Sequence, residues 1–314
     1  MSQPVVYIAL QQFCEYDEQP LHQLRVAGCD VRRNALGRRM GREELREALQ
    51  DADAVVAGVE PYDAELLKAL PRLRCISRCG VGTDSIDLEA ARQQGVVVYT
   101  TTEEVVEPVA QMTITMILAL ARNIPRHLAD VRGGRWKKWT GALLSEWTIG
   151  LVGFGRIGRS VERYLAAFAP RVLVADPRLR STDVPDRVQL RELGALLAES
   201  NLVSLHASRQ RGQGVLIGRQ ELSQMKRGAY LVNTARGFLV DEGALYDTLI
   251  SGHLAGAALD VFEHEPYAGP LAGLPQVLCT PHVSSLARAS RVAMEWRCAQ
   301  HILEHFSQNQ KEGS

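Results

Sequence analysis

The sequence has no excess of charge of either sign. Its 314 residues include 36 lysines and arginines and 36 aspartates and glutamates, so the formal net charge is zero. A protein that binds nucleic acid or an anionic membrane through its overall field needs a surplus of basic residues. The composition therefore predicts no nucleic-acid partner and no membrane partner.

Long hydrophobic runs are also absent. The longest apolar stretch without a charge, residues 112–121, is much shorter than the roughly 20 residues that a membrane-spanning helix needs. The apolar run near the N-terminus, residues 5–10, has no basic flank or cleavage site and is too short for a signal sequence. We interpret that run as a buried strand and predict a cytoplasmic protein.

Cysteines are few and scattered. None of the six forms a Cys-x-x-Cys pair, and no histidine cluster has the spacing of metal ligands, so we predict reduced, buried thiols and no metal site. Internal repeats and low-complexity segments are absent. With 46% hydrophobic and 23% charged residues, the chain lacks the signature of disorder and is expected to fold.

The length predicts two domains. In the first hundred residues, short β-branched runs alternate with helical patterns, as in a parallel sheet covered by helices. The predicted strands are Val5–Leu10, Asp30–Arg33, Ala54–Ala57, Cys75–Arg78 and Val96–Tyr99, and the predicted helices are Leu21–Ala27, Arg42–Asp51, Asp63–Leu70 and Leu88–Gln94. A second series of this kind runs from Thr148 to about residue 285.

Two further helical patterns connect these series. One runs from about Val106 to Arg122 and links the domains. The other lies near the C-terminus and has no strands of its own, so we expect it to dock on the first domain. The predicted domains are therefore residues 1–100 with 287–314, and residues 101–286. The apolar stripe expected on the terminal helix comprises Val292, Trp296, Ala299, Leu303 and Phe306.

A dinucleotide-binding fingerprint follows the strand pattern at residues 148–152. Gly153, Gly155 and Gly158 form a Gly-x-Gly-x-x-Gly turn that leads into the helical run from Ser160 to Phe168. In this setting the glycines permit a tight turn, close approach of a pyrophosphate, and close packing of helix on strand. The pyrophosphate would rest on the helix N-terminus, where unpaired N–H groups favour an anion.

An acid follows at the position that this motif requires. The next strand pattern, residues 171–175, ends at Asp176, whose carboxylate can bind the ribose hydroxyls and repel a 2′-phosphate. This predicts NAD as the cofactor. Arg178 and Arg180 lie close by and could accommodate a 2′-phosphate, so NADP stays an alternative.

Three later strand patterns end at chemically useful residues. One runs into Arg236, whose planar fork of donors suits a substrate carboxylate. The other two lead to Glu265 and to His282. The His282 imidazole could carry a proton, and Glu265 could be its carboxylate partner. His206 and His264 are rival proton carriers, and spacing alone does not choose among the three histidines.

The separated motifs resemble one known family. The fingerprint turn, the segments 233–237, 240–245 and 252–262, Glu265-Pro266 and Thr280-Pro281-His282 are similar to those of the D-isomer-specific 2-hydroxyacid dehydrogenases, in the same order. The resemblance spans nearly the whole chain. It implies an α/β protein with two doubly wound parallel-sheet domains, in which a Rossmann NAD domain is inserted into a flavodoxin-like substrate domain.

The resemblance also implies residue roles. Arg236 is then the substrate clamp, His282 the general acid and base, and Glu265 its partner, while the loop from Arg78 to Asp84 holds the substrate carboxylate through Val81 and Gly82. A nest of backbone amides of this kind binds anions. The implied contacts of NAD are Gly153, Gly155, Arg156, Ile157, Gly158, Asp176, Thr234, Ala235, Asp260, Ser284 and Ser285.

These roles predict an NAD-dependent oxidoreductase that moves a hydride to or from C2 of a D-2-hydroxy or 2-oxo acid. The motifs are closest to phosphoglycerate dehydrogenase-like members, and a glyoxylate or hydroxypyruvate reductase and a non-catalytic NAD-sensing protein are the alternatives. The family implies a homodimer through the NAD domain and its arm. The sequence departs from the family pattern at Gln111, Ser85 and Ala207-Ser208-Arg209.

Overall fold

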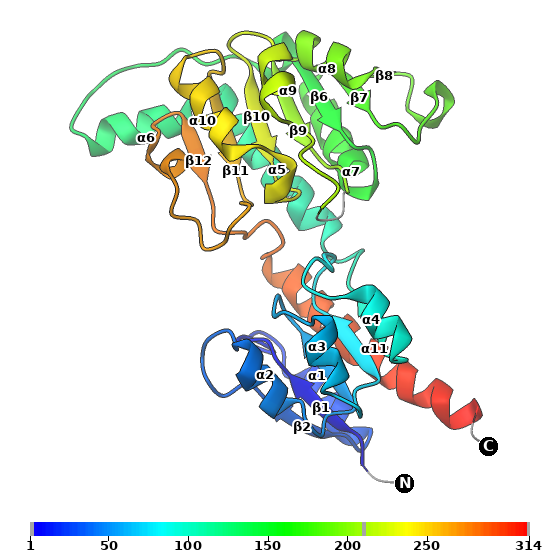
Figure 1. Cartoon of the computed structure of the whole chain (residues 1–314). Helices are drawn as coiled ribbons and strands as arrows, with labels where there is room; N and C mark the ends of the chain where they lie inside the picture. Colours follow the sequence, from blue (N-terminus) through cyan, green and yellow to red (C-terminus); the bar gives the residue numbers. More distant parts are fainter. Residues whose placement is uncertain (1–2, 209–211, 313–314) are drawn as a thin grey trace. The chain divides into compact units, whose positions relative to one another are not determined.

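The chain folds into two compact units. The computed structural model describes residues 3–208 and 212–312, with side chains as far as residue 308. One unit comprises Met1–Val105 and Ser285–Ser314, and the other comprises Val106–Ser284 (Figure 1). The predicted domain boundaries, after residues 100 and 286, lie close to the points where the chain passes between the units.

The first unit is a five-stranded parallel sheet with the order β2-β1-β3-β4-β5. Its strands are β1 (Val5–Ile8), β2 (Asp30–Arg33), β3 (Ala54–Ala57), β4 (Cys75–Arg78) and β5 (Val97–Thr100). Its helices are α1 (Gln19–Val26), α2 (Arg42–Ala48), α3 (Ala64–Lys68), α4 (Leu88–Gln93) and α11 (Arg288–Glu312). Alternate strand residues form a core with α2, α3 and α4, while α11 packs against β3, β4 and β5 on the other face.

The buried face of α11 differs from the predicted stripe. Of the five predicted residues only Ala299 is fully buried, and the others are partly exposed. The face that is buried contains Met294, Glu295, Cys298, Ala299, His301, Ile302 and His305. The prediction was wrong because it counted only apolar residues, whereas the sheet provides polar partners such as the Ser77 hydroxyl, 3.1 Å from His301 Nδ1.

The second unit is a seven-stranded parallel sheet with the order β12-β11-β10-β9-β6-β7-β8. Its strands are β6 (Thr148–Val152), β7 (Arg171–Ala175), β8 (Val188–Leu190), β9 (Leu202–Leu205), β10 (Tyr230–Asn233), β11 (Gly256–Leu259) and β12 (Val277–Cys279). Its helices are α5 (Val106–Ala121), α6 (Ile124–Arg132), α7 (Arg156–Leu165), α8 (Leu193–Glu199), α9 (Arg219–Gln224) and α10 (Glu242–Ile250). The direction of winding reverses between β6 and β9, which is where doubly wound sheets bind ligands.

The predicted fold class is confirmed, because both sheets are entirely parallel and each is doubly wound. Core residues lie on both faces of the second sheet. Parallel strands buried on both faces consist of continuous apolar runs, and β6, β9 and β11 show this pattern. The predicted catalytic residues Arg236, Glu265 and His282 follow the carboxyl ends of β10, β11 and β12.

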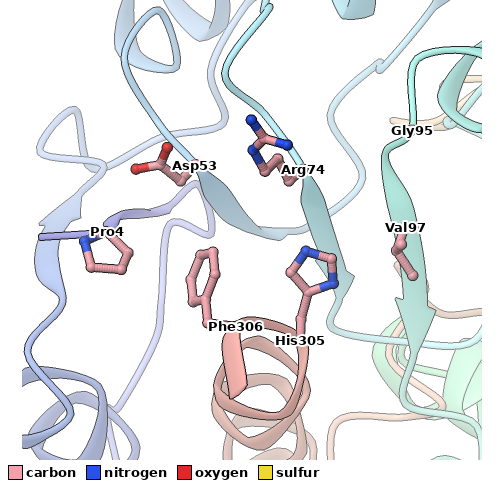
Figure 2. Close-up of a pocket in the computed structure, with 7 residues that line it drawn as sticks. All are labelled: Pro4, Asp53, Arg74, Gly95, Val97, His305 and Phe306. Atoms are coloured by element: carbon pink, nitrogen blue, oxygen red, sulfur yellow. The ribbon is translucent and has the colours of Figure 1, made fainter. Parts of the chain in front are cut away.

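A cavity of about 350 Å³ lies at the amino ends of the strands of the first sheet (Figure 2). Its lining includes Asp53 and Arg74, which precede β3 and β4, together with His305 and Phe306 of α11. Parallel α/β sheets bind their substrates at the carboxyl ends of the strands. The cavity therefore lies away from the edge that carries Val81 and Gly82.

Candidate active site

The glycine turn between β6 and α7 has the three properties that a pyrophosphate site needs. Gly153 has a φ of +91°, and a side chain there would meet Ala207 N at 2.6 Å. A methyl group on Gly158 would lie 2.5 Å from Gly153 O, so this glycine permits close packing of helix on strand. A methyl group on Gly155 would meet no atom within 4 Å. This glycine therefore leaves open space in front of the N-terminus of α7.

Asp176 lies at the end of β7 and faces the glycine turn. Its Oδ2 accepts a hydrogen bond from Phe154 N at 3.0 Å, and its Oδ1 accepts from Arg178 N at 3.1 Å and Arg178 Nε at 3.2 Å. Burial raises the pKa of Asp176, but the hydrogen bonds from Arg178 and Phe154 outweigh burial and lower it. The carboxylate is therefore charged near the turn.

The two arginines that could have accommodated a 2′-phosphate have acidic partners. Arg178 pairs with Asp176, and Arg180 pairs with Asp183 at 3.7 Å. A 2′-phosphate would have to approach the Asp176 carboxylate and break the pair that Arg178 makes. The charges at this turn thus fit the ribose of NAD.

Three adjacent strands bring the predicted catalytic residues to one edge of the second sheet. Arg236 follows β10, Glu265 follows β11 and His282 follows β12, and these strands are neighbours in the sheet. His282 Nδ1 lies 2.9 Å from Glu265 Oε2, while Glu265 Oε1 accepts from Phe262 N at 3.0 Å. Because Glu265 holds Nδ1, His282 Nε2 is the ring nitrogen that can exchange a proton with a substrate.

The electrostatics of Glu265 fit this arrangement. Burial raises the pKa of its carboxyl, but the hydrogen bonds from His282 and Phe262 N, together with the charges of His282 and Arg236, lower it overall. Glu265 therefore stays ionised in the neutral range. A charged carboxylate at Nδ1 favours the imidazolium that forms when Nε2 takes up a proton.

Asp260 has a role that the sequence did not reveal. This fully buried carboxylate accepts hydrogen bonds from Thr280 Oγ1 at 2.5 Å and from the backbone N–H groups of Val283 and Ser284, both at 2.9 Å. These bonds tie down the segment around His282, whose φ of 54° lies in the left-handed region. Such a conformation in a residue other than glycine needs support from its surroundings. The predicted contact of Asp260 with NAD stays a prediction.

The rival histidines lie in different settings. His206 Nε2 is 3.0 Å from Ser204 Oγ, and burial lowers the pKa of its imidazole to about 4. An imidazole that resists protonation to this extent is a poor proton donor at neutral pH. His264 is exposed, and Glu265 pairs with His282 rather than with this immediate neighbour.

The other predicted NAD contacts lie near the same edge or at the turn. Thr234 Oγ1 is 2.9 Å from Thr113 Oγ1, and Ala235 N donates to Asn233 Oδ1 at 3.0 Å. Within the described residues the buried Ser284 hydroxyl has no hydrogen-bond partner, which is consistent with a polar ligand. Arg156 and Ile157 begin α7. Ser285 belongs to the first unit.

The predicted anion loop lies in the first unit at the end of β4. Gly80 has a φ of +138° and donates to Thr101 Oγ1 at 2.7 Å, and Arg78 Nε donates to Gly82 O at 3.0 Å. In the described part of the chain, the N–H groups of Val81 and Gly82 donate to no acceptor. Two such adjacent donors can receive a carboxylate.

The comparison with known proteins agrees with this geometry. Residues 114–284, more than half of the chain, match the family described as "D-isomer specific 2-hydroxyacid dehydrogenase, NAD binding domain". The chain belongs to this family. It is accordingly an NAD-dependent dehydrogenase acting on CH–OH groups, as its resemblance to the family predicted.

Relatives of this dehydrogenase differ in substrate. It is 36% identical over 258 residues to the hydroxypyruvate reductase of Thermotoga maritima, covering 80% of this chain and 84% of the relative. It is 37% identical over 270 residues to the D-3-phosphoglycerate dehydrogenase of Archaeoglobus fulgidus, covering 84% of this chain and 51% of that relative. The chain thus spans about half the length of this second relative.

A solved structure supports the same family fold. The D-lactate dehydrogenase of Aquifex aeolicus, complexed with NAD and lactic acid, superposes with a TM-score of 0.83 at 27% identity. The match covers 98% of this chain and 96% of that structure.

The residues that depart from the family pattern lie in the following places in this dehydrogenase. Gln111 lies on an exposed part of α5 and its Nε2 donates to Tyr164 Oη at 3.3 Å. Ser85 O accepts a hydrogen bond from Tyr62 N. Ala207 and Ser208 follow β9, and Arg209 lies outside the described residues.

Proposed function

We propose that this dehydrogenase interconverts a D-2-hydroxy acid and its 2-oxo acid, with His282 as the general acid and base. The observation that carries the proposal is the 2.9 Å pair between His282 and Glu265 next to the strand that delivers Arg236. NADH, when bound, supplies the hydride that reduces the carbonyl carbon. The glycine turn, Asp176 and the Ser284 hydroxyl fit that cofactor.

The proton passes through a single imidazole. In the reduction, protonated His282 donates from Nε2 to the oxygen that becomes the hydroxyl, and Glu265 stabilises the imidazolium before the transfer. In the oxidation, neutral His282 accepts that proton. The Asp260 carboxylate accepts hydrogen bonds from Val283 N and Ser284 N, and these bonds hold the histidine in place in the reduction and in the oxidation.

Substrate binding is assigned to Arg236 and to the loop of the first unit. The Arg236 guanidinium offers a planar fork of donors to a carboxylate and carbonyl oxygen. The N–H groups of Val81 and Gly82 supply an anion cradle. A dehydrogenase with these groups needs a carboxylate beside the reacting carbonyl, so simple ketones are expected to be poor substrates.

For the specific substrate we favour a phosphoglycerate dehydrogenase-like activity, that is, the reduction of 3-phosphohydroxypyruvate. The family motifs and the similarity to a D-3-phosphoglycerate dehydrogenase support it. Hydroxypyruvate or glyoxylate reduction is the second candidate. The similarity to the hydroxypyruvate reductase of Thermotoga maritima supports it, because the match covers 84% of that relative's length.

One assay tests the activity and its substrate. NADH oxidation is measured with 3-phosphohydroxypyruvate, hydroxypyruvate, glyoxylate and pyruvate, using wild type and Arg236→Ala. We expect turnover of at least one 2-oxo acid by the wild type and a large loss in the variant. Absence of turnover with every substrate, together with intact NADH binding, would instead favour the NAD-sensing protein that the sequence left as an alternative.

We also propose a homodimer formed through α6. Ile124, Leu128 and Val131 lie on one face of this helix and are exposed, and the following arm exposes Trp136 and Leu143. Exposed large apolar side chains gathered on one helix face are typical of a protein interface. The partners expected for this protein are thus a second copy of the chain and its small-molecule substrate.

No helix within residues 3–208 and 212–312 is long and apolar enough to cross a membrane. The predicted cytoplasmic location stays a prediction.

A further inference from the structure

Two buried cysteines meet in the first unit, where β4 packs against α11. Cys79 directly follows β4, and its N–H extends the ladder by donating to Ala57 O at 2.9 Å. Alternate residues of an extended strand share a face, so Cys79 lies on the same face as Ser77. Because Ser77 Oγ is 3.1 Å from His301 Nδ1, this face is the one that α11 covers.

The facing cysteine is Cys298. It precedes His301 by three residues and so lies on the same face of α11. Its Sγ lies 3.9 Å from Ser77 O, two residues before Cys79, and the thiols of Cys298 and Cys79 affect each other's pKa. The exposed fractions are 6% for Cys79 and 0% for Cys298, so only a small reagent can reach the pair.

The two thiols differ in acidity. Cys298 and the charges of Arg291 and Arg78 lower the pKa of Cys79, although burial opposes them. Burial raises the pKa of Cys298 well above its ordinary value. The reactive form of cysteine is the thiolate, so Cys79 is the nucleophile of the pair. Burial raises the pKa of the other four thiols: Cys14 to about 11, Cys29, Cys75 to about 12 and Cys279 to about 11.

We propose that Cys79 and Cys298 form a reversible disulfide when the protein meets hydrogen peroxide. The Cys79 thiolate attacks one peroxide oxygen, which gives a sulfenic acid and releases hydroxide that takes up the thiol proton to form water. The Cys298 sulfur then attacks the sulfenic sulfur, forms the S–S bond and releases a second water. Two thiols and one peroxide become one disulfide and two waters, and the two electrons pass from sulfur to oxygen.

The disulfide has a consequence for substrate binding, and this part rests on the proposed function. Cys79 directly precedes the loop of Gly80, Val81 and Gly82, which we assign to the substrate carboxylate. An S–S bond of about 2 Å draws Cys79 towards α11 and shifts the N–H groups of that loop. Oxidation therefore raises the KM for the 2-oxo acid. The KM for NADH stays unchanged, because the glycine turn belongs to the second unit.

Peptide mapping tests the disulfide itself. The full-length protein is treated with hydrogen peroxide, alkylated in denaturant and digested without reduction. We expect a peptide pair that links Cys79 to Cys298 and is lost after dithiothreitol, in wild type and in the matched controls Cys75→Ser and Cys29→Ser. Sulfinic acid at Cys79, or full alkylation of both cysteines, would overturn the proposal.

Kinetics test the effect on the substrate. Peroxide should raise the KM for the 2-oxo acid roughly tenfold, since small displacements of binding groups are costly. Dithiothreitol should reverse the change, and Cys298→Ser should not show it. A mapped disulfide with unchanged KM would overturn the regulatory part. If the untreated protein reduces no 2-oxo acid, the proposed function fails, while mapping and amide hydrogen exchange of residues 80–82 still decide whether the disulfide forms and moves the loop.

Discussion

His282 owes its position to groups that do not react. Glu265 fixes one ring nitrogen, and Asp260 fixes the residues on both sides of the histidine by accepting hydrogen bonds from the Thr280 hydroxyl and from Val283 N. The left-handed φ of His282 needs this support, because only glycine adopts it without strain. At the scale of single residues, the imidazole that we propose as the proton carrier is thus held by two carboxylates.

Replacing the imidazole tests its role as the proton carrier. His282→Asn should lower kcat by about 10² to 10⁴-fold, since general acid–base catalysis contributes that much. Binding of NADH, measured by its fluorescence, should be unchanged because the glycine turn is intact. His264→Asn is the matched control and should keep its activity. Equal kcat values for wild type and His282→Asn would contradict the assignment.

Asp176 is expected to select NAD over NADP. Asp176→Asn retains an acceptor for Phe154 N but removes the charge, so the ratio of kcat/KM for NADPH to that for NADH should rise roughly tenfold, or ~1.4 kcal/mol. Steady-state kinetics with both cofactors measure this ratio. Asp183→Asn, which changes the partner of Arg180, should leave the ratio unchanged. An unaltered ratio in Asp176→Asn would show that other groups select the cofactor.

At the scale of elements, α11 is attached to its sheet by polar groups. Glu295 accepts a hydrogen bond from Cys14 N, and Tyr99 of β5 stacks on His301 with the ring centroids 4.9 Å apart. A buried polar group must be paired, so each of these contacts specifies one docking position for the helix. The helix thereby closes the first unit with residues from the far end of the chain.

The histidines of α11 make the first unit sensitive to acid. Burial, with the charge of Arg297, lowers the pKa of His301 below its ordinary value of 6.5, and burial with the charge of Arg74 lowers that of His305. In the unfolded chain these groups take up protons near pH 6.5, whereas in the folded chain they do so at lower pH. The stability is therefore complete above pH 6.5 and declines as the pH falls below it.

Denaturant unfolding at pH 7.5 and pH 5.0 measures this decline. His301→Gln can still hydrogen-bond to Ser77 but cannot titrate, so its midpoint should fall less between the two pH values than that of wild type. His22→Gln replaces an exposed histidine of the same unit and should behave as wild type. If the midpoint of His301→Gln fell as far as that of wild type between the two pH values, His301 would not be a source of the acid sensitivity.

At the scale of the whole molecule, the exposed apolar face of α6 is the interface that we propose for the homodimer. Leu128 is 45% exposed and lies between Ile124 and Val131 on that face. Leu128→Lys places a charge in the proposed interface and should convert the dimer to a monomer, as measured by light scattering after gel filtration. Gln220→Lys, which places the same charge at an exposed position of α9, should stay dimeric. A monomeric wild type would contradict the proposal directly.

The sequence by itself determined the local features of this protein. The glycine turn, the acid after the next strand and the strand ends at Arg236, Glu265 and His282 were readable because each depends on short-range spacing. The order of the motifs was enough to indicate the family. The alternation of short β-branched runs with helical patterns also predicted the parallel sheets.

Only the tertiary structure decided what distant segments do to one another. It brought His282 Nδ1 to 2.9 Å from Glu265 Oε2, turned the terminal helix away from its apolar stripe, and placed Cys298 and Cys79 on facing elements. Each of these outcomes depends on contacts between residues far apart in the chain, whose energies come from burial and paired polar groups. The periodicity of the sequence does not predict such contacts. A polar residue that is buried and paired cannot be distinguished, from its type alone, from one that is exposed to water.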